Sequence, residues 1–433
     1  MGKRSFVIGT TAAVVTAVSF VGLQVANPSW ASFRSSPKEV VDEVWQIVNR
    51  EYVDATFNQT DWEAQRRELL DREYATDEQA YEAIREALEG LDDPYTRFLD
   101  PKQFASMQID TSGELTGVGI TLSANEETER LTVVSPIEGS PAFEAGVQAR
   151  DIITAIDGTS TEGMDVNSAV NLIRGEEGTS VTLSILRDDT EKLEFDITRA
   201  RIELQAVRHE LRDEGGYQVG YMRLTQFSGN AADGMRSALK ELEADGVNGY
   251  ILDLRSNPGG LLYSSAEIAR MFLDEGSIVS TVNRKGIPDK ISANRRALTD
   301  KPVVVLVDGG SASASEILSG ALQDNSRAII VGTKTFGKGL VQSVHSLSGG
   351  AGLAVTIARY RTPNGTDIDQ KGISPDIAIE LTENDIERLS DNRDLVATPE
   401  DPQYSMALQT LRRRMAGETR AQVISSAVTS ALN

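Results

Sequence analysis

The chain has 433 residues, 40% of them hydrophobic and 25% charged, a composition typical of a folded protein with two or three domains. Its formal net charge of −22 disfavours binding to nucleic acid or to anionic lipid. Cysteine is absent, which excludes disulfides, thiolate zinc sites and cysteine nucleophiles. The two histidines, His209 and His345, leave little material for a metal cluster or a Ser-His-Asp triad.

The first 31 residues are typical of an export signal. Lys3 and Arg4 precede an apolar stretch, and the small residues Ser29 and Ala31 suit cleavage after Ala31. The stretch is also long enough to persist as a membrane anchor, so the sequence leaves open whether the signal is removed. We expect an exported protein that is either free or membrane-associated.

Residues 36–105 predict a small helical domain. Ser36 and Glu39 have the spacing of a capping box, and apolar residues then recur at helical spacing through Tyr52. A second helix is expected at 76–88, because it begins with a capping pair and is followed by glycine.

Residues 111–200 predict a compact β-rich module. Its expected strands are at 117–122, 131–134, 151–156 and 181–186, and its expected helix is at 166–173. The loop formed by Gly117, Val118, Gly119 and Ile120 suits backbone capture of a terminal carboxylate, and it suits a plain strand entrance equally well. Arg174 follows the helix and either pairs with the helix dipole or reaches toward a bound peptide.

Residues 205–380 alternate strands with helices, which predicts a layered α/β domain. The expected strands are at 219–224, 249–254 and 303–307, and the expected helices are at 231–244, 264–272 and 315–323. Residues 381–433 are expected to form a polar connector and then a helix at about 406–415.

The stretch from residue 308 to residue 342 is the richest in chemistry. A buried strand leads into glycines and then into a helix, and N–H groups at a helix start are free to stabilise an oxyanion. Ser313 is either a nucleophile or a helix cap, because Ser313 and Glu316 have capping-box spacing. A nucleophile also needs a base, and since neither histidine is near in sequence, lysine is the obvious substitute.

Lys338 lies between two glycines, which give the backbone room to direct its side chain into a tight site. A lysine acts as a base only when it is desolvated, and we expect Phe336, Leu340 and Val341 to supply apolar surroundings. The alternatives are an exposed turn lysine and a phosphate-binding loop. The latter lacks the required Ser or Thr after the lysine, and a predicted strand follows it.

A second strand-to-loop junction runs from Asp253 to Gly260. Its paired glycines allow a backbone amide to approach a ligand closely, as an oxyanion donor must, and they also suit an ordinary turn. Asp253 and Arg255 can likewise be interpreted as a structural ion pair.

Taken together, these residues resemble the carboxyl-terminal processing peptidases, also called tail-specific proteases, over nearly the whole chain after the signal. The matching motifs are DPYTRF at 93–98, GVG at 117–119, DLR at 253–255 with Gly259 and Gly260, SASASE at 311–316, and TFGKG at 335–339 with VQ at 341–342. The resemblance implies an N-terminal helical domain (36–105), a PDZ domain (111–200), an α/β core of the crotonase-like ββα type (205–380) and a C-terminal helix.

The resemblance implies that Ser313 is the nucleophile of a serine endopeptidase, that Lys338 is its general base, and that Gln342 orients the lysine through a hydrogen bond. The other implied positions are backbone oxyanion donors at Gly259 and Ala314 and a supporting residue at Asp324. The PDZ loop at 117–120, with Arg174 nearby, is implied to bind the peptide.

The resemblance further implies that the enzyme needs no metal or nucleotide cofactor and that its substrates are proteins with free apolar C-termini. It also implies that a regulatory partner can bind the PDZ domain, and that the protein is exported to the periplasm or the thylakoid lumen. The sequence is most similar to cyanobacterial and plastid members of the family, some of which trim the C-terminal extension of the photosystem II reaction-centre precursor. Two alternatives remain: a noncatalytic, chaperone-like peptide-binding protein, and an acyl-CoA enzyme of the crotonase type.

Overall fold

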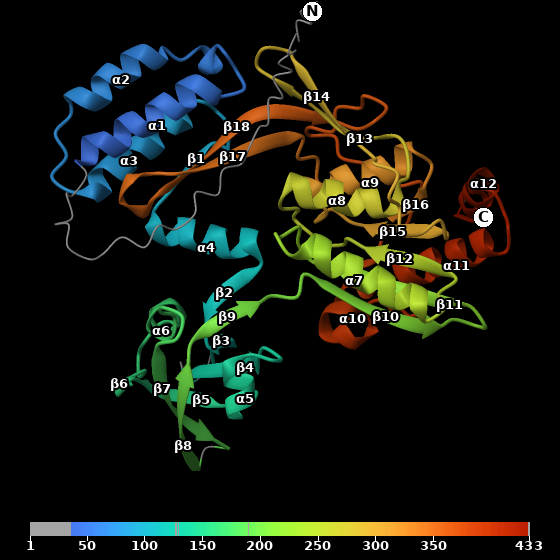
Figure 1. Cartoon of the computed structure of the whole chain (residues 1–433), viewed down its shortest axis with the longest axis horizontal. Coiled ribbons are helices and arrows are strands. Elements are labelled where there is room, and N and C mark those ends of the chain that lie inside the picture. The colour runs from blue at the N-terminus through green and yellow to red at the C-terminus, as the bar shows by residue number, and fades with distance from the viewer. Residues whose placement is uncertain (1–35, 126–127, 129, 189, 432–433) are drawn as a thin grey trace, which may run out of the picture. The chain divides into compact units, whose positions relative to one another are not determined.

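The structure is a computed structural model that describes residues 36–431, apart from residues 126, 127, 129 and 189. The predicted export signal lies outside these residues. None of the helices within them combines the length and the apolar character that a membrane crossing needs. Figure 1 shows the helices and strands with their labels.

Helices begin the described part of the chain. They are α1 (Pro37–Glu51), α2 (Trp62–Asp71) and α3 (Asp77–Glu89), followed by strand β1 (Arg97–Leu99) and helix α4 (Pro101–Ser112). Apolar residues of α1, α2, α3 and β1 share one buried cluster with Leu353 and Val355 of strand β18 (Gly352–Arg361). The helices predicted at the start and at 76–88 are confirmed. The sequence missed α2, which buries only Trp62 and Leu69 and therefore has no apolar stripe.

The PDZ-like module (residues 111–200) is built on a sheet of antiparallel strands. Its elements are β3 (Ile120–Ala124), β4 (Leu131–Pro136), α5 (Pro141–Ala145), β5 (Ile152–Ile156), β6 (Thr159–Ser160), α6 (Val166–Ile173), β7 (Ser180–Arg187) and β8 (Glu191–Thr198). The strand order β3-β4-β5-β7-β8 places β3 at an edge. The strand predicted at 117–122 is wrong as one piece, because Gly119 has a φ of 82° and interrupts it.

Two short strands connect this module to the rest of the chain. Strand β2 (Glu114–Gly117) pairs antiparallel with β9 (Ala200–Glu203). At their base, the N–H of Leu204 donates to the carbonyl of Gly113 at 2.8 Å. The side-chain amide of Asn230 donates to the carbonyls of both Gly113 and Leu204 at 3.1 Å. The chain therefore leaves and re-enters the core at neighbouring points.

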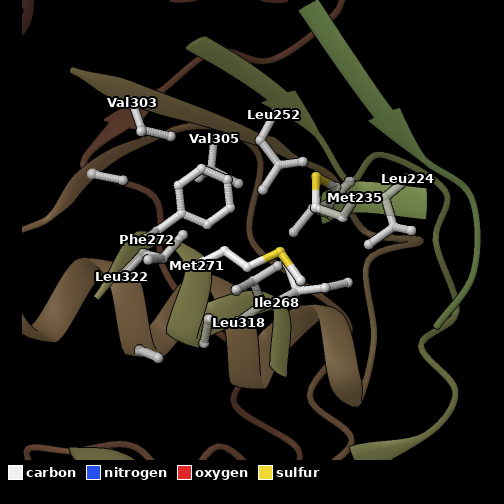
Figure 2. Close-up of a cluster of buried hydrophobic side chains, with 14 of the residues drawn as sticks. Leu224, Met235, Leu252, Ile268, Met271, Phe272, Val303, Val305, Leu318 and Leu322 are labelled. Carbon is white, nitrogen blue, oxygen red and sulfur yellow. The ribbon is translucent and has the colours of Figure 1, made fainter. Parts of the chain in front are cut away.

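A six-stranded sheet forms the centre of the α/β core. Its order is β10 (Val207–Asp213), β11 (Gln218–Leu224), β12 (Gly249–Asp253), β15 (Val303–Val307), β16 (Ala328–Gly332) and β19 (Ile377–Ala378). Helices α7 (Ala231–Ala244), α8 (Leu262–Phe272) and α9 (Ala314–Asp324) share one buried cluster with this sheet. Figure 2 shows Met271 and Phe272 of α8 packed with Leu318 of α9 beneath Leu252 and Val305 of the strands. All six elements predicted for this domain are confirmed.

A second sheet lies in the same domain. It consists of β1, β18, β13 (Ser277–Asn283) and β14 (Pro288–Ser292), with β17 (Leu340–Ser346) paired to β18. The sequence predicted a strand after Lys338, which β17 confirms, but it did not predict the partner strands. Strands β13 and β14 are only partly buried, and the mostly buried β18 does not alternate regularly between buried and exposed residues, so none of them has a clear strand pattern in the sequence.

Three helices end the described part of the chain: α10 (Glu383–Asp391), α11 (Pro402–Met415) and α12 (Arg420–Ala431). Residues of α11 and α12 share one buried cluster with the other face of the six-stranded sheet. Helix α11 begins four residues earlier than the predicted start at about 406. Asp401 caps α11 and accepts a hydrogen bond from Arg255 Nη1 at 2.7 Å, while Arg255 Nη2 pairs with Asp253 at 2.7 Å. The predicted structural ion pair of Asp253 and Arg255 is present and extends to this helix.

We expect Asp401→Ala to lower the free energy of unfolding by about 3 to 5 kcal/mol, because it leaves the buried Arg255 charge without one of its partners. Asp401 is 0% exposed and also accepts from the N–H groups of Ala397 and Gln403 at 3.0 Å. Urea unfolding measures the change, with the exposed neighbour Glu400→Ala as the control. Equal unfolding midpoints for the two variants would show that the pair does not fix the helix.

Candidate active site

Two strand-to-loop turns are joined by hydrogen bonds at the end of the six-stranded sheet. The turn after β15 begins at Asp308, whose carboxylate accepts from the N–H of Ser256 at 2.8 Å. Ser311 Oγ donates to the carbonyl of Leu254 at 2.8 Å, and the N–H of Ala312 donates to the carbonyl of Asn257 at 3.0 Å. The two junctions singled out in the sequence therefore form one structure.

Ser313 lies at the start of α9 with an unusual backbone. Its φ of 53° and ψ of −110° are in a region that a residue with a side chain rarely occupies. The expected pairing with Glu316 is present, since the N–H of Ser313 donates to Glu316 Oε2 at 2.8 Å. Ala314 is the first residue of the helix. Its backbone N–H therefore has no acceptor carbonyl within the helix.

Gly259 lies against the turn formed by residues 312–314. A Cβ at this position would lie 2.9 Å from both Ala314 N and Ser313 Cβ, and the φ of Gly259 is 103°. Both facts require glycine. The N–H of Gly259 donates to Oδ1 of Asn257 at 2.9 Å. The Gly259 N–H donates to another oxygen only after its hydrogen bond to Asn257 is broken.

The carboxylate of Glu316 connects the serine turn to the lysine loop. Glu316 is 0% exposed. Besides Ser313, it accepts from Thr335 Oγ1 at 2.6 Å, from the N–H of Gly337 at 2.7 Å and from the N–H of Lys338 at 2.9 Å. The sequence identified Glu316 only as a capping partner. The position of this acidic residue directly before the apolar Ile317 and Leu318 was the available signal of a larger role.

Tyr360 makes a second bridge between Ser313 and Lys338. Its hydroxyl contacts the carbonyl of Ser313 at 3.2 Å and also the carbonyl of Lys338. The ring is 1% exposed, and burial raises the pKa of Tyr360 well above its ordinary value, which keeps the phenol neutral as a donor. No sequence motif pointed to this residue, because β18 was not predicted.

The Lys338 side chain is half-buried. Burial lowers the pKa of Lys338 below its ordinary value, and the charge of Arg97 lowers it further, while Asp93 and Glu316 act in the opposite direction. The predicted shielding of Lys338 by Phe336 is wrong, because Phe336 is 59% exposed. The backbone N–H of Phe336 donates to the carbonyl of Ser311. The Tyr95 ring is instead beside the ammonium, with Nζ 4.6 Å from the ring centroid.

The side chains of Ser313, Lys338 and Gln342 are not linked in this structure. Among the described residues, no hydrogen bond joins Lys338 Nζ to Ser313 Oγ or to Gln342, and Gln342 Nε2 is buried without a partner. Asp324 lies at the other end of α9, where it accepts from the N–H of Asn364 at 2.9 Å. It supports a turn and is not part of the cluster around Ser313.

The loop at 117–120 is held by its carbonyl groups. The carbonyl of Val118 accepts from Ala142 N, and that of Gly119 accepts from Ile137 N, both at 2.8 Å. A Cβ on Gly119 would lie 2.3 Å from Cβ of Ser140, so the position requires glycine. The loop leads into β3, which pairs only with β4 among the described strands and has a free edge.

Arg174 does not cap its helix with its side chain. The carbonyls at the end of α6 accept from Arg199, whose Nε bonds Ile173 at 2.8 Å and whose Nη2 bonds Leu172 at 3.0 Å. Arg174 instead lines a cavity of about 1050 Å³ whose wall also includes Gly259 and Gly260. Arg174 is also the residue at the C-terminal end of α6, so its position is compatible both with pairing to the helix dipole and with a reach toward a ligand.

Comparisons with known proteins agree with this architecture. A model of peptidase family S41 matches residues 218–379, and a model of the PDZ domain matches residues 132–187. The carboxyl-terminal-processing protease of Synechocystis sp. is 47% identical over 387 residues, which are 89% of this chain and 89% of that protein. The predicted fold class is confirmed.

Two further relatives extend the comparison. The chloroplastic carboxyl-terminal-processing peptidase 2 of Arabidopsis thaliana is 39% identical, covering 84% of this chain and 72% of that protein. A solved structure of a photosystem II D1 C-terminal processing protease is 37% identical with a TM-score of 0.50, and it covers 80% of this chain and 93% of that one. The chain therefore belongs to the carboxyl-terminal-processing proteases of peptidase family S41 and is a serine-type peptidase.

Proposed function

We propose that Ser313 is the nucleophile of this peptidase and that Lys338 is its general base. The observation that supports this most is the Glu316 carboxylate, which accepts hydrogen bonds from the backbone N–H groups of both residues. Burying a carboxylate costs several kcal/mol unless hydrogen bonds replace its hydration, and four donors do so here. It fixes the serine and the lysine in one frame.

The proposed reaction proceeds through an acyl-enzyme. Ser313 Oγ attacks the carbonyl carbon of the scissile peptide while the neutral amine of Lys338 takes the hydroxyl proton. The resulting ammonium then gives that proton to the leaving amine. Water attacks the ester, Lys338 accepts the water's proton, and that proton returns to Ser313 as the acid product leaves. Lys338 Nζ must move from the Tyr95 ring toward Ser313 for the first step.

Backbone N–H groups supply the proposed oxyanion site. Ala314 N–H at the start of α9 is one donor, and the positive end of the helix dipole adds to it. Gly259 N–H is the second donor once substrate displaces Oδ1 of Asn257. This exchange keeps the donor satisfied in the free enzyme. Gln342 Nε2, buried without a partner among the described residues, is a further donor or positioning group that productive binding would engage.

We infer that the substrate enters by its C-terminus. A terminal carboxylate would bind the N–H groups at 117–120, and the preceding residues would add to the free edge of β3. The cavity lined by Arg174 and Gly259 then leads toward Ser313. Free apolar C-termini suit this path, because they pair as a strand without a charge other than the carboxylate.

We further propose that the protein is exported to the periplasm or thylakoid lumen and that its substrates include the photosystem II reaction-centre precursor. The N-terminal sequence supports export. The solved structure at 37% identity acts on D1 by its description, which supports the substrate.

We expect purified enzyme to cleave an unstructured protein with an apolar C-terminus, and Ser313→Ala and Lys338→Ala to lose this cleavage by at least about 1000-fold, because each removes a participant in proton transfer. Mass spectrometry identifies the products. Amidation of the substrate C-terminus tests the terminal carboxylate and should raise KM. If all three proteins bind the tail and none cleaves it, the peptide-binding alternative replaces this proposal.

We expect Glu316→Gln to lower kcat by about 100-fold or more while the fold is kept, because an amide nitrogen would face N–H groups that a carboxylate accepted. Circular dichroism and initial rates measure the two effects. The control is Glu241→Gln, which removes an exposed partner of His209 far from this cluster. Normal turnover in Glu316→Gln would contradict the proposed frame.

We expect Ser313→Gly to be more stable than Ser313→Ala by roughly 1 to 2 kcal/mol, because glycine tolerates the positive φ and alanine does not. Both variants lack the hydroxyl, so the comparison isolates the backbone. Urea unfolding midpoints measure it. Equal midpoints would mean that the backbone relaxes when the hydroxyl is removed.

A further inference from the structure

The segment DPYTRF at 93–98 places an aromatic ring beside Lys338. Tyr95 presents its ring to the ammonium, with Nζ 4.6 Å from the centroid. Within the part of the chain that the structure describes, Lys338 Nζ has no hydrogen bond or ion pair. The ring face is therefore the contact made by this cation.

Hydrogen bonds on both sides of Tyr95 fix its position. Asp93 accepts from the N–H of Tyr95 at 3.0 Å and from Thr96 Oγ1 at 2.7 Å. Thr96 Oγ1 in turn accepts from the N–H of Thr356 in β18 at 3.0 Å. Arg97 then pairs with Ala354 of β18. The ring is thus attached to the strand that also bears Tyr360, the residue that bridges Ser313 and Lys338.

Several groups act on the pKa of Lys338. Burial lowers this pKa and the charge of Arg97 lowers it further, while the charges of Asp93 and Glu316 raise it. The carboxylate of Glu316 is already occupied by four donors. Asp369 acts on the Tyr95 ring, and burial together with this charge raises the pKa of Tyr95, so the ring stays a neutral phenol. A neutral ring face attracts a cation and not a neutral amine.

We propose, on the basis of the function above, that Tyr95 is a positioning residue that binds Lys338 only in its protonated form. The ammonium lies on the ring and makes no hydrogen bond to Ser313. The neutral amine has no such attraction and is free to turn toward the hydroxyl. The position of the base is thereby linked to its proton, and the contact with Tyr95 raises the pH at which the base becomes available.

The test is the pH dependence of kcat/KM, whose acid limb reports the deprotonation of Lys338 in the free enzyme. Tyr95→Leu removes the ring face, destabilises the ammonium and lowers the pKa of Lys338, so the limb moves to lower pH. A cation–π contact corresponds to a shift of about 0.4 to 1.5 pH units. Tyr95→Phe keeps the ring and leaves the limb near its original pH. A merely structural role for Tyr95 would lower the rate in Tyr95→Leu without moving the acid limb. A limb that Tyr95→Leu does not move overturns the proposal.

A measurement without turnover covers variants that are too slow to assay. In Ser313→Ala, the Nζ resonance of Lys338 in 15N-labelled lysine is assigned by its loss in the additional Lys338→Ala variant and is then titrated. We expect a lower pKa of Lys338 when Tyr95→Leu is added. An unchanged pKa would contradict the role of Tyr95. If Lys338→Ala alone retains normal cleavage, the proposed function fails, whereas an inactive Lys338→Ala with an unmoved titration refutes only the role of Tyr95.

Discussion

The carboxylate of Glu316 accepts four hydrogen bonds in a site that water does not reach, and the geometry around Ser313 depends on it. Isolating a charge from water costs several kcal/mol unless hydrogen bonds replace the lost hydration. Here three backbone N–H groups and one hydroxyl do so, and the first turn of α9 adds its dipole. Because these donors belong to the serine turn and the lysine loop, any displacement of either segment leaves part of the charge unsatisfied.

The central sheet determines where this carboxylate lies. Strands β12 and β15 are neighbours and run parallel, so the turns that follow them emerge at the same edge. Asp308 and Ser311 then tie one turn to the other. Below them, Arg255 links the same edge to helix α11 through Asp401. The site is thus supported from both faces of the sheet.

Much of this architecture could be predicted from the sequence where the pattern is strong. The buried runs at 249–254 and 303–307 and the amphipathic helices between them have clear periods, and Ser313 stands at a recognisable helix start. What escaped prediction are contacts made across long separations. Tyr360 and Tyr95 reach Lys338 from strands or loops that have weak local signals, and Phe336 was expected to be buried because it is adjacent in sequence. Adjacency does not reveal on which side of the loop a ring will lie.

Strands β2 and β9 join the PDZ-like module to the core at one place. The N–H of Leu204 and the carbonyl of Gly113 are hydrogen-bonded, so the whole stretch between them begins and ends at one point on the core. In topological terms the stretch is an inserted domain, and the polypeptide on either side is continuous without it. The core is therefore able to acquire, exchange or lose this module in evolution without rearranging the strands that bear Ser313 and Lys338.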